Sequence, residues 1–160
     1  MGRYPKLPEY LKQALRQIEP SRAQLISYYP CIVTMQSGRV LDRVYVQEEL
    51  TYFKAWGVYP EEDSGKSWIK IDEVASVAES PSRLPAALAT ELYDAGETGM
   101  GGHEFTVEFS DGRKEFFAGG NAVDFIEYPR GKSLKDVVNV RQKGRGTPQQ
   151  RPPYYWCLYS

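Results

Sequence analysis

The chain has 160 residues, of which 26% are charged and 41% hydrophobic, close to the average of soluble globular proteins. Its 20 basic and 21 acidic residues give a net charge of -1, and aromatic residues make up 13%. This composition excludes a bulk polyanion binder, a disordered acidic chain and a coiled coil. The length suits one ordinary domain or two very small ones.

The lack of a recognisable targeting signal and the low number of cysteines both favour a cytoplasmic protein. The N-terminal residues hold no apolar run of signal-peptide length, and no apolar stretch is long enough to span a membrane. Cys31 and Cys157 stand near opposite ends of the chain. We expect two reduced thiols, with a disulfide between them as the alternative.

Hydrophobic periodicity predicts an amphipathic helix of about three turns within residues 1–24 and a β-rich unit at residues 25–80. The apolar stripe of the helix consists of Leu7, Leu11, Ala14, Leu15 and Ile18. This stripe docks on the rest of the chain or, alternatively, in a groove of a partner. From Cys31 the period changes to two, and Ser37-Gly38 marks the turn of a β-hairpin, after which an aromatic segment and a short strand follow.

The second half of the chain is predicted to follow a similar plan. Residues 81–102 form a linker helix and a glycine-rich loop. Residues 103–142 form a second β-rich unit, with a hairpin turn at Asp111-Gly112 and a last strand at residues 137–140. Residues 143–160 form a basic and aromatic C-terminal extension.

An internal repeat is the strongest pattern in the chain. Residues 33–39 (VTMQSGR) match residues 107–113 (VEFSDGR) at a distance of 74 positions. That distance falls to 63 because the second copy is shorter by 11 residues, as three later matches indicate: Tyr59-Pro60 with Tyr128-Pro129, Lys66-Ser67 with Lys132-Ser133, and Glu73-Val74 with Asp136-Val137. We interpret the deletions as changes in loops.

The strand, turn and strand at the start of each copy resemble the small barrels of the Sm and SH3 types. Gly120-Asn121 is the nearest counterpart of the Asn-bearing motif with which Sm proteins contact RNA. The resemblance covers a short stretch of each copy, and no functional residue is carried over from it. We therefore predict an α+β fold: two tandem SH3/Sm-like β-rich repeats packed together, an N-terminal helix, a central bridging helix and an irregular C-terminal extension.

Residue types that support catalysis or metal binding are scarce. His103 is the only histidine, and no cluster of Cys or His has the spacing of zinc ligands. No Gly-x-Ser-x-Gly motif occurs around a serine. We therefore expect no metal, no cofactor and no enzyme activity.

The glycine-rich loop that precedes His103 is a candidate ligand site. Its order of helix, loop and strand is the reverse of common phosphate-binding loops, which favours a structural turn. The alternative is a loop that contacts a small molecule through Glu97, Thr98, Gly99, Gly101, Gly102 and His103.

The last twenty residues differ in charge from the rest of the chain. They carry four basic and no acidic residues, whereas residues 1–140 have a net charge of -5. Three interpretations compete: the tail docks on its own body, it anchors a protein partner, or it binds single-stranded nucleic acid through arginine and stacking aromatic side chains. The candidate partner-binding residues are Arg145, Arg151, Tyr154, Tyr155, Trp156 and Tyr159.

From these patterns we predict a small cytoplasmic, non-enzymatic module that binds a protein partner. The first alternative is an RNA-binding small-barrel protein that uses the tail together with Arg39 and Arg113 at the two hairpin turns. The second alternative is a small-ligand-binding protein or enzyme at residues 96–103.

Overall fold

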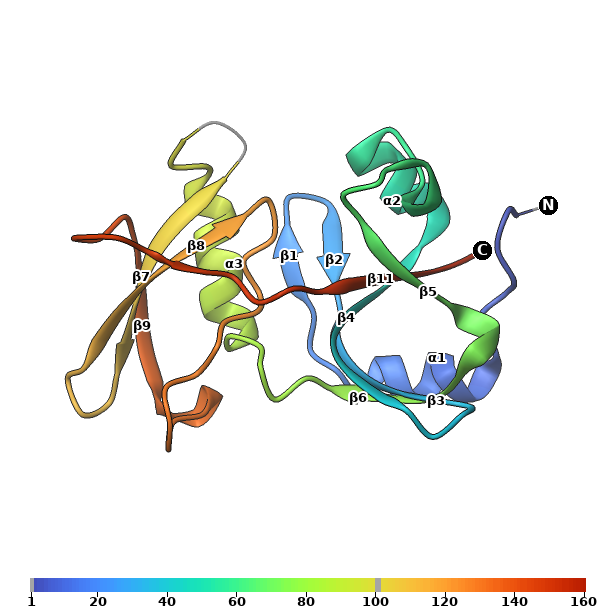
Figure 1. Ribbon diagram of the computed structural model, residues 1–160, viewed down its shortest axis with the longest axis horizontal. Coiled ribbons are helices and arrows are strands. Elements are labelled where there is room, and N and C mark those ends of the chain that lie inside the picture. The colour runs from blue at the N-terminus through green and yellow to red at the C-terminus, as the bar shows by residue number, and fades with distance from the viewer. Residues whose placement is uncertain (1, 100–101) are drawn as a thin grey trace. The chain divides into compact units, whose positions relative to one another are not determined.

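The chain divides into two compact units, each built from segments far apart in the sequence (Figure 1). The computed structural model describes residues 2–99 and 102–160 and confirms the α+β class. Unit 1 contains residues 2–20, Tyr28–Ser80 and Tyr154–Ser160. Unit 2 contains Ser21–Ser27 and Pro81–Pro153. Each unit has its own cluster of buried hydrophobic side chains.

Unit 1 is organised around a five-stranded sheet with the strand order β5-β11-β4-β3-β6. Its strands are β3 (Pro30–Met35), β4 (Val40–Glu48), β5 (Ser67–Lys70), β6 (Val74–Glu79) and β11 (Tyr155–Tyr159). β3 pairs antiparallel with β4 and β6, as the predicted hairpin and short strand require. β11 pairs parallel with both β4 and β5, so the last residues of the chain lie inside the sheet.

Two helices accompany this sheet. Helix α1 (Glu9–Arg16) contacts β6 and is shorter than the three turns expected, although Leu7 and Ile18 beyond its ends are also buried. Helix α2 (Glu49–Trp56) contacts β4 and β11 and contains most of the aromatic segment that follows the first hairpin. It ends at Gly57, whose φ of 78° forms a left-handed cap. Two 3-10 turns, η1 (Pro60–Glu62) and η2 (Ile71–Glu73), flank β5.

Unit 2 is organised around a four-stranded sheet with the order β10-β8-β7-β9. Its strands are β7 (His103–Phe109), β8 (Lys114–Gly120), β9 (Val137–Gln142) and β10 (Gln149–Gln150). A 3-10 turn, η3 (Leu134–Asp136), leads into β9, and helix α3 (Ala86–Ala95) contacts β9. A short hairpin of β1 (Ser21–Ala23) and β2 (Ile26–Tyr28) joins this unit through the contact of β1 with α3.

A buried polar network explains why Ser21 belongs to unit 2 although it follows the N-terminal helix. The Arg83 guanidinium donates to Ser21 Oγ at 3.1 Å, and Ser21 Oγ donates to Asp124 Oδ1 at 2.5 Å. Tyr93 donates to the other carboxylate oxygen of Asp124 at 2.5 Å. Arg83 and Asp124 are 1% and 0% exposed, and buried charges of this kind are stable only when hydrogen-bonded.

Two parts of the predicted fold need correction. Neither main sheet closes into a barrel, since each sheet ends in strands that do not pair with each other, so SH3/Sm-like barrels are not confirmed. The C-terminal extension is not irregular, because it contains β10 and β11. The prediction failed there because a strand needs partners for its backbone, and for β11 those partners lie about a hundred residues earlier.

Two further observations bear on the sequence-based expectations. Cys31 and Cys157 are reduced thiols, as expected, and both are buried. Among the helices that the structure describes, none is long and apolar enough to cross a membrane.

Candidate functional site

The aromatic residues of the tail lie within unit 1. Trp156 is 1% exposed and stacks on Tyr45, with the ring centroids 4.8 Å apart. It also meets Tyr52 edge-on at 4.9 Å, and Tyr154 packs against Tyr45 at 5.3 Å. Tyr155 and Tyr159 are partly buried. Of the three interpretations of the tail, this packing is the one in which the aromatic terminus docks on its own body.

The basic residues of the tail lie elsewhere, in unit 2. Arg141 is the penultimate residue of β9, and Lys143, Arg145 and Arg151 follow the strand. The structure therefore separates the two halves of the predicted partner-binding set: Arg145 and Arg151 belong to one unit, and the four aromatic residues belong to the other.

The unit 2 sheet has one buried face and one outer face. Phe105, Val107 and Phe117 point into the core, so their strand neighbours Thr106 and Phe116 point outward. Thr106 lies opposite Phe116 on one side and opposite Arg141 on the other. Phe116, Thr106 and Arg141 thus form a row across three strands of the outer face.

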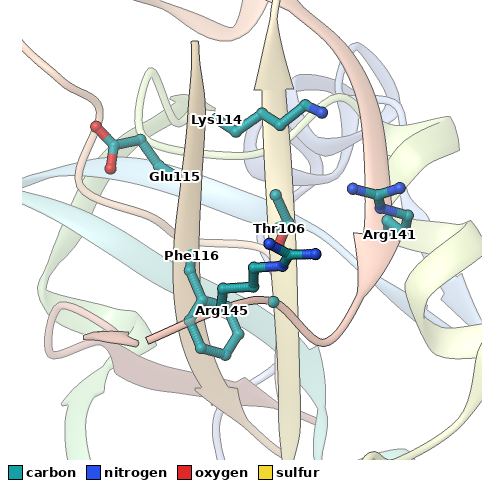
Figure 2. Close-up of a pocket in the computed structure, with 7 residues that line it drawn as sticks. Thr106, Lys114, Glu115, Phe116, Arg141 and Arg145 are labelled. Atoms are coloured by element: carbon teal, nitrogen blue, oxygen red, sulfur yellow. The ribbon is translucent and has the colours of Figure 1, made fainter. Parts of the chain in front are cut away.

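A cavity of about 460 Å3 lies on this outer face, and we call it the basic pocket (Figure 2). It is lined by Thr106, Lys114, Glu115, Phe116, Arg141, Gly144 and Arg145. In the described part of the chain, none of its three cations is paired with a carboxylate. Positive charges gathered in a concave site attract anions more strongly than the same charges scattered over a surface.

Glu115, whose carboxylate is the acidic group among the residues that line the basic pocket, is bonded to other side chains. Glu115 Oε1 accepts from Arg113 Nε at 2.8 Å and pairs with Arg113 Nη2 at 2.6 Å, while Glu115 Oε2 accepts from Gln149 at 2.9 Å. Figure 2 shows this carboxylate pointing away from the cationic side chains. Glu104 and Glu108 also face outward on β7, so the cationic character is local to the pocket.

The segment after β9 crosses the outer face and positions Arg145. Thr106 Oγ1 donates to the Lys143 carbonyl at 2.7 Å, and Lys143 N–H donates to the Glu104 carbonyl at 2.7 Å. Lys143 has a φ of 64°, an uncommon conformation for a residue other than glycine. Gly144 then lies so close to Phe116 and Thr106 that a side chain would clash with both. This backbone path turns Arg145 back over the sheet.

The predicted glycine-rich loop lines a second cavity, of about 390 Å3, which we call the glycine-loop cavity. It is lined by Thr98, Gly99, Gly102, His103, Glu104, Ala118, Gly120, Pro148, Gln150 and Arg151. The structure thus brings Arg151 to four of the predicted loop residues. Glu97 is not in the lining, and Gly101 lies outside the described residues. His103 is 7% exposed, and burial lowers the pKa of its imidazole.

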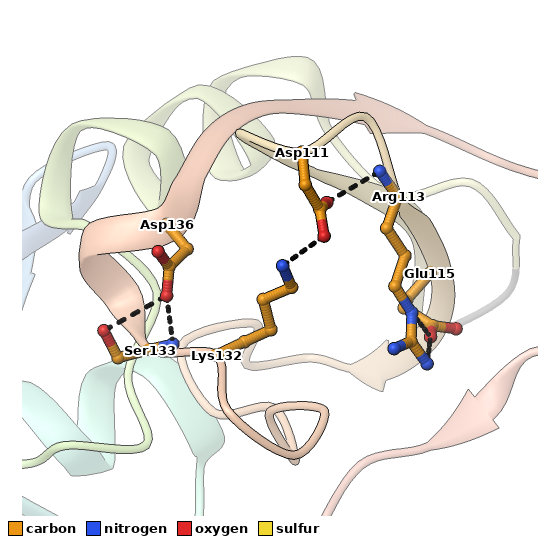
Figure 3. Close-up of polar contacts among 6 residues, drawn as sticks. All are labelled: Asp111, Arg113, Glu115, Lys132, Ser133 and Asp136. Atoms are coloured by element: carbon orange, nitrogen blue, oxygen red, sulfur yellow. Dashed lines mark hydrogen bonds and ion pairs between the residues drawn. The ribbon is translucent and has the colours of Figure 1, made fainter.

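The arginines at the two hairpin turns do not join either cavity. Arg113 is held by Glu115, and its backbone N–H donates to Asp111 at 2.9 Å (Figure 3). Asp111 is also paired with Lys132, which lowers the Asp111 pKa. Beside them, Ser133 and Asp136 cap η3 reciprocally. This network closes the hairpin turn and leaves Arg113 neutralised. Arg39 lies in unit 1 and is exposed.

Of the seven residues that line the basic pocket, only Arg145 was a candidate in the sequence analysis, and the missed ones include Lys114, Phe116 and Arg141. A signal for Phe116 exists, because adjacent strand residues face opposite sides, so Phe116 and Phe117 cannot both enter the core. The two cations give no comparable signal, since their proximity depends on the pairing of three strands.

The described residues offer little for metal chemistry or nucleophilic catalysis. They contain no group of three His, Cys, Asp or Glu side chains placed to hold a metal ion. Thr106 is the only hydroxyl among the residues that line the basic pocket, and it is already bonded to Lys143. The arrangement suits anion binding. Comparisons with protein-family models, curated proteins and solved structures found no significant match to this chain.

Proposed function

We propose that this protein is a non-enzymatic, cytoplasmic binding module whose unit 2 binds single-stranded nucleic acid in the basic pocket. The observation that carries the proposal is the row of Phe116, Thr106 and Arg141, with Lys114 and Arg145 beside it and no carboxylate paired with any of the three cations in the described chain. This proposal develops the RNA-binding alternative from the sequence, which used the tail together with Arg39 and Arg113. It keeps Arg145 of the tail and replaces the hairpin arginines with residues of the outer sheet face.

An aromatic ring next to cationic side chains provides the contacts that bind a single-stranded nucleotide. A partly exposed ring offers a surface for base stacking, and arginine and lysine neutralise the adjoining phosphates. Phe116 is partly exposed and borders the cavity, with Arg145 beside its ring in Figure 2. Because a paired base is stacked on both sides inside a duplex, this site favours single strands.

Binding of fluorescein-labelled octauridylate, followed by fluorescence anisotropy, tests the proposal. We expect the logarithm of the affinity to fall with the logarithm of salt concentration with a slope of about -2, since three neutralised phosphates contribute about 0.7 each. Phe116→Ala weakens binding roughly 5- to 150-fold through loss of one stacked base. The double variant Arg141→Ala/Arg145→Ala lowers both the affinity and the slope.

Matched control variants distinguish binding in the basic pocket from a general effect of net charge. Arg130→Ala and Lys135→Ala each remove one cation of unit 2 outside both cavities, and they should leave binding within twofold. Binding that is unaffected by Arg141→Ala/Arg145→Ala, or that falls equally in the control variants, would contradict the proposal.

A second candidate is the protein partner favoured by the sequence, now at unit 1. Leu50, Phe53 and Val58, on and just after α2, are 58%, 42% and 40% exposed. Phe53 stacks on Tyr59 with the ring centroids 5.0 Å apart, and the Arg3 guanidinium lies 4.2 Å from the Tyr59 ring centroid. Exposed apolar side chains gathered in this way are typical of protein-binding surfaces.

A pull-down in the presence of nuclease tests this second candidate. The same defined protein should be captured by the wild type and by Arg141→Ala/Arg145→Ala, and it should be lost with Leu50→Asp/Phe53→Asp. Capture that is equal with all three proteins would rule out this surface.

The similarity of the two units also supports a proposal about their origin as tandem copies of one β-rich plan. The support is the common register of the β3–β4 and β7–β8 hairpins and of their third strands. Under this proposal, the outer sheet face of unit 2 is the face that no helix covers in this copy, among the residues that the structure describes.

A further inference from the structure

The two cavities of unit 2 lie on the same face of one sheet. The basic pocket is lined by Thr106 and Phe116, and the glycine-loop cavity is lined by Glu104 and Ala118. Each of these pairs is two residues apart along its strand, and residues two apart point to the same side. The glycine-loop cavity therefore continues the basic pocket along β7 and β8.

One chain segment also connects the two cavities. Gly144 and Arg145 line the basic pocket, and Pro148, Gln150 and Arg151 line the glycine-loop cavity. Between them β10 pairs in parallel with β8, and Arg151 N–H donates to the Ala118 carbonyl at 3.1 Å. Arg141, Arg145 and Arg151 are thereby distributed along one continuous outer face.

Arg151 is held at the far end of this face by a glycine. Its guanidinium lies directly over Gly120, where a Cβ would overlap the Nη1 atom. Gly120 also has a φ of 67°, which strains other residues. The absence of a side chain at position 120 allows the guanidinium to lie against the backbone, at the rim of a cavity that is also lined by Thr98, Glu104, Gln150 and the buried His103.

We propose that a single-stranded oligonucleotide bound in the basic pocket extends along the outer face into the glycine-loop cavity, where Arg151 contacts a further backbone phosphate. This inference rests on the proposed function and defines its ligand class as an oligonucleotide of several residues. Phe116 and Gly120 are four strand residues apart, or about 13 Å. Stacked nucleotides of one strand advance about 3.4 Å each, so the ligand spans several nucleotides.

Chain length is the variable that tests the inference. Fluorescein-labelled uridylates of two, four and eight nucleotides are titrated against the wild type, Arg151→Gln and the matched control Arg130→Gln. We expect Arg151→Gln to weaken octamer binding three- to tenfold, to reduce the octamer salt slope by about 0.7, and to leave dimer binding within twofold. The control should match the wild type at every length.

The outcomes separate this inference from the function on which it rests. If Arg141→Ala/Arg145→Ala abolishes binding at all lengths and Arg151→Gln changes none, the basic pocket stands and the extension is wrong. If Arg151→Gln weakens the dimer as much as the octamer, Arg151 acts within the basic pocket, which also overturns the extension. If no uridylate binds the wild type, both proposals fail. Arg151 is exposed, and circular dichroism checks that the variant is folded.

Discussion

The two units share a three-stranded plan down to individual hydrogen bonds. At the first hairpin turn Met35 N–H donates to the Arg39 carbonyl at 2.8 Å, and at the second Phe109 N–H donates to the Arg113 carbonyl at 2.9 Å. Val33 pairs with Val77 in β6, and Val107 pairs with Val140 in β9. In both units the ladder shifts register one residue before the turn, at Thr34/Met35 and at Glu108/Phe109.

The units differ in the elements that cover the outer face of the three shared strands. In unit 1 the returning strand β4 is paired with β11, and α2 contacts both strands, so Tyr45 and Trp156 are almost completely buried. In unit 2 the returning strand β8 is paired only with the two exposed residues of β10 on that edge, and the described residues between β8 and η3 form no helix. One backbone plan therefore yields a sheet covered on both sides in unit 1 and an open face with a local basic pocket in unit 2.

Truncating the buried tryptophan of the covering strand β11 should have the largest effect on this comparison. Trp156→Ala is expected to lower the free energy of unfolding by about 3–5 kcal/mol, because it empties a buried aromatic site. Gln149→Ala/Gln150→Ala should cost less than about 0.5 kcal/mol, since both side chains are exposed. Urea unfolding, with amide exchange read separately in β4 and β7, measures both. Equal losses in the two variants would contradict the assigned roles of β11 and β10.

The two hairpin turns should respond alike to substitution. Gly38 and Gly112 both have a φ of 89°, and no atom lies within 4 Å of an added Cβ at either position. Gly38→Ala and Gly112→Ala should therefore each cost about 1–2 kcal/mol, through backbone strain alone. The urea midpoint of each variant gives the comparison, and a difference above 1 kcal/mol would show that the turns are not equivalent.

The two units also differ in the hydrogen bonding of a buried tyrosine hydroxyl, for which we expect a smaller effect on stability. Tyr128 Oη donates to the Arg83 carbonyl at 2.6 Å in unit 2, whereas the buried Tyr52 hydroxyl in unit 1 has no hydrogen-bond partner among the described residues. Tyr128→Phe should cost about 1 kcal/mol, and Tyr52→Phe should leave stability unchanged or raise it. Thermal unfolding of the two variants tests this, and a larger loss for Tyr52→Phe would refute it.

The smallest expected effect is on pH dependence. Asp111 occupies the turn position held by Ser37 in unit 1, and its bond with Lys132 lowers the Asp111 pKa. A carboxyl whose pKa is lower in the folded than in the unfolded state stabilises the folded state above the unfolded pKa of about 4. This stabilisation is lost as pH falls through the lower, folded pKa. Asp111→Ser should therefore flatten the decline in unit 2 stability below pH 4. Urea midpoints at pH 6, 4 and 3 measure this decline, and an unchanged decline would exclude the contribution.

Local patterns determined much of the secondary structure in advance. The turns at Ser37-Gly38 and Asp111-Gly112, the strands β6 and β9, and helix α3 follow from residues that are close in sequence. Helix α2 was missed because aromatic residues suit strands and helices alike, although Gly57 offered a stop signal.

The candidate site was only partly accessible from the sequence. Arg145, Arg151 and the residues around His103 stood out by charge and glycine content. Two cavities of unit 2 contain Arg145, Arg151, His103 and three further residues of the glycine-rich loop. Lys114 and Arg141 did not stand out, because their proximity arises from the pairing of three strands.

The sequence by itself determined the two hairpins, the short strands β6 and β9 and the alternation of inward and outward side chains along them, since these depend on neighbouring residues. Only the tertiary structure decided that β11 fills the unit 1 sheet, and that the basic residues before it remain on the face of unit 2. The physical reason is that an alternating strand defines two faces without specifying which one will be covered. That choice depends on backbone partners and apolar surfaces supplied by distant segments.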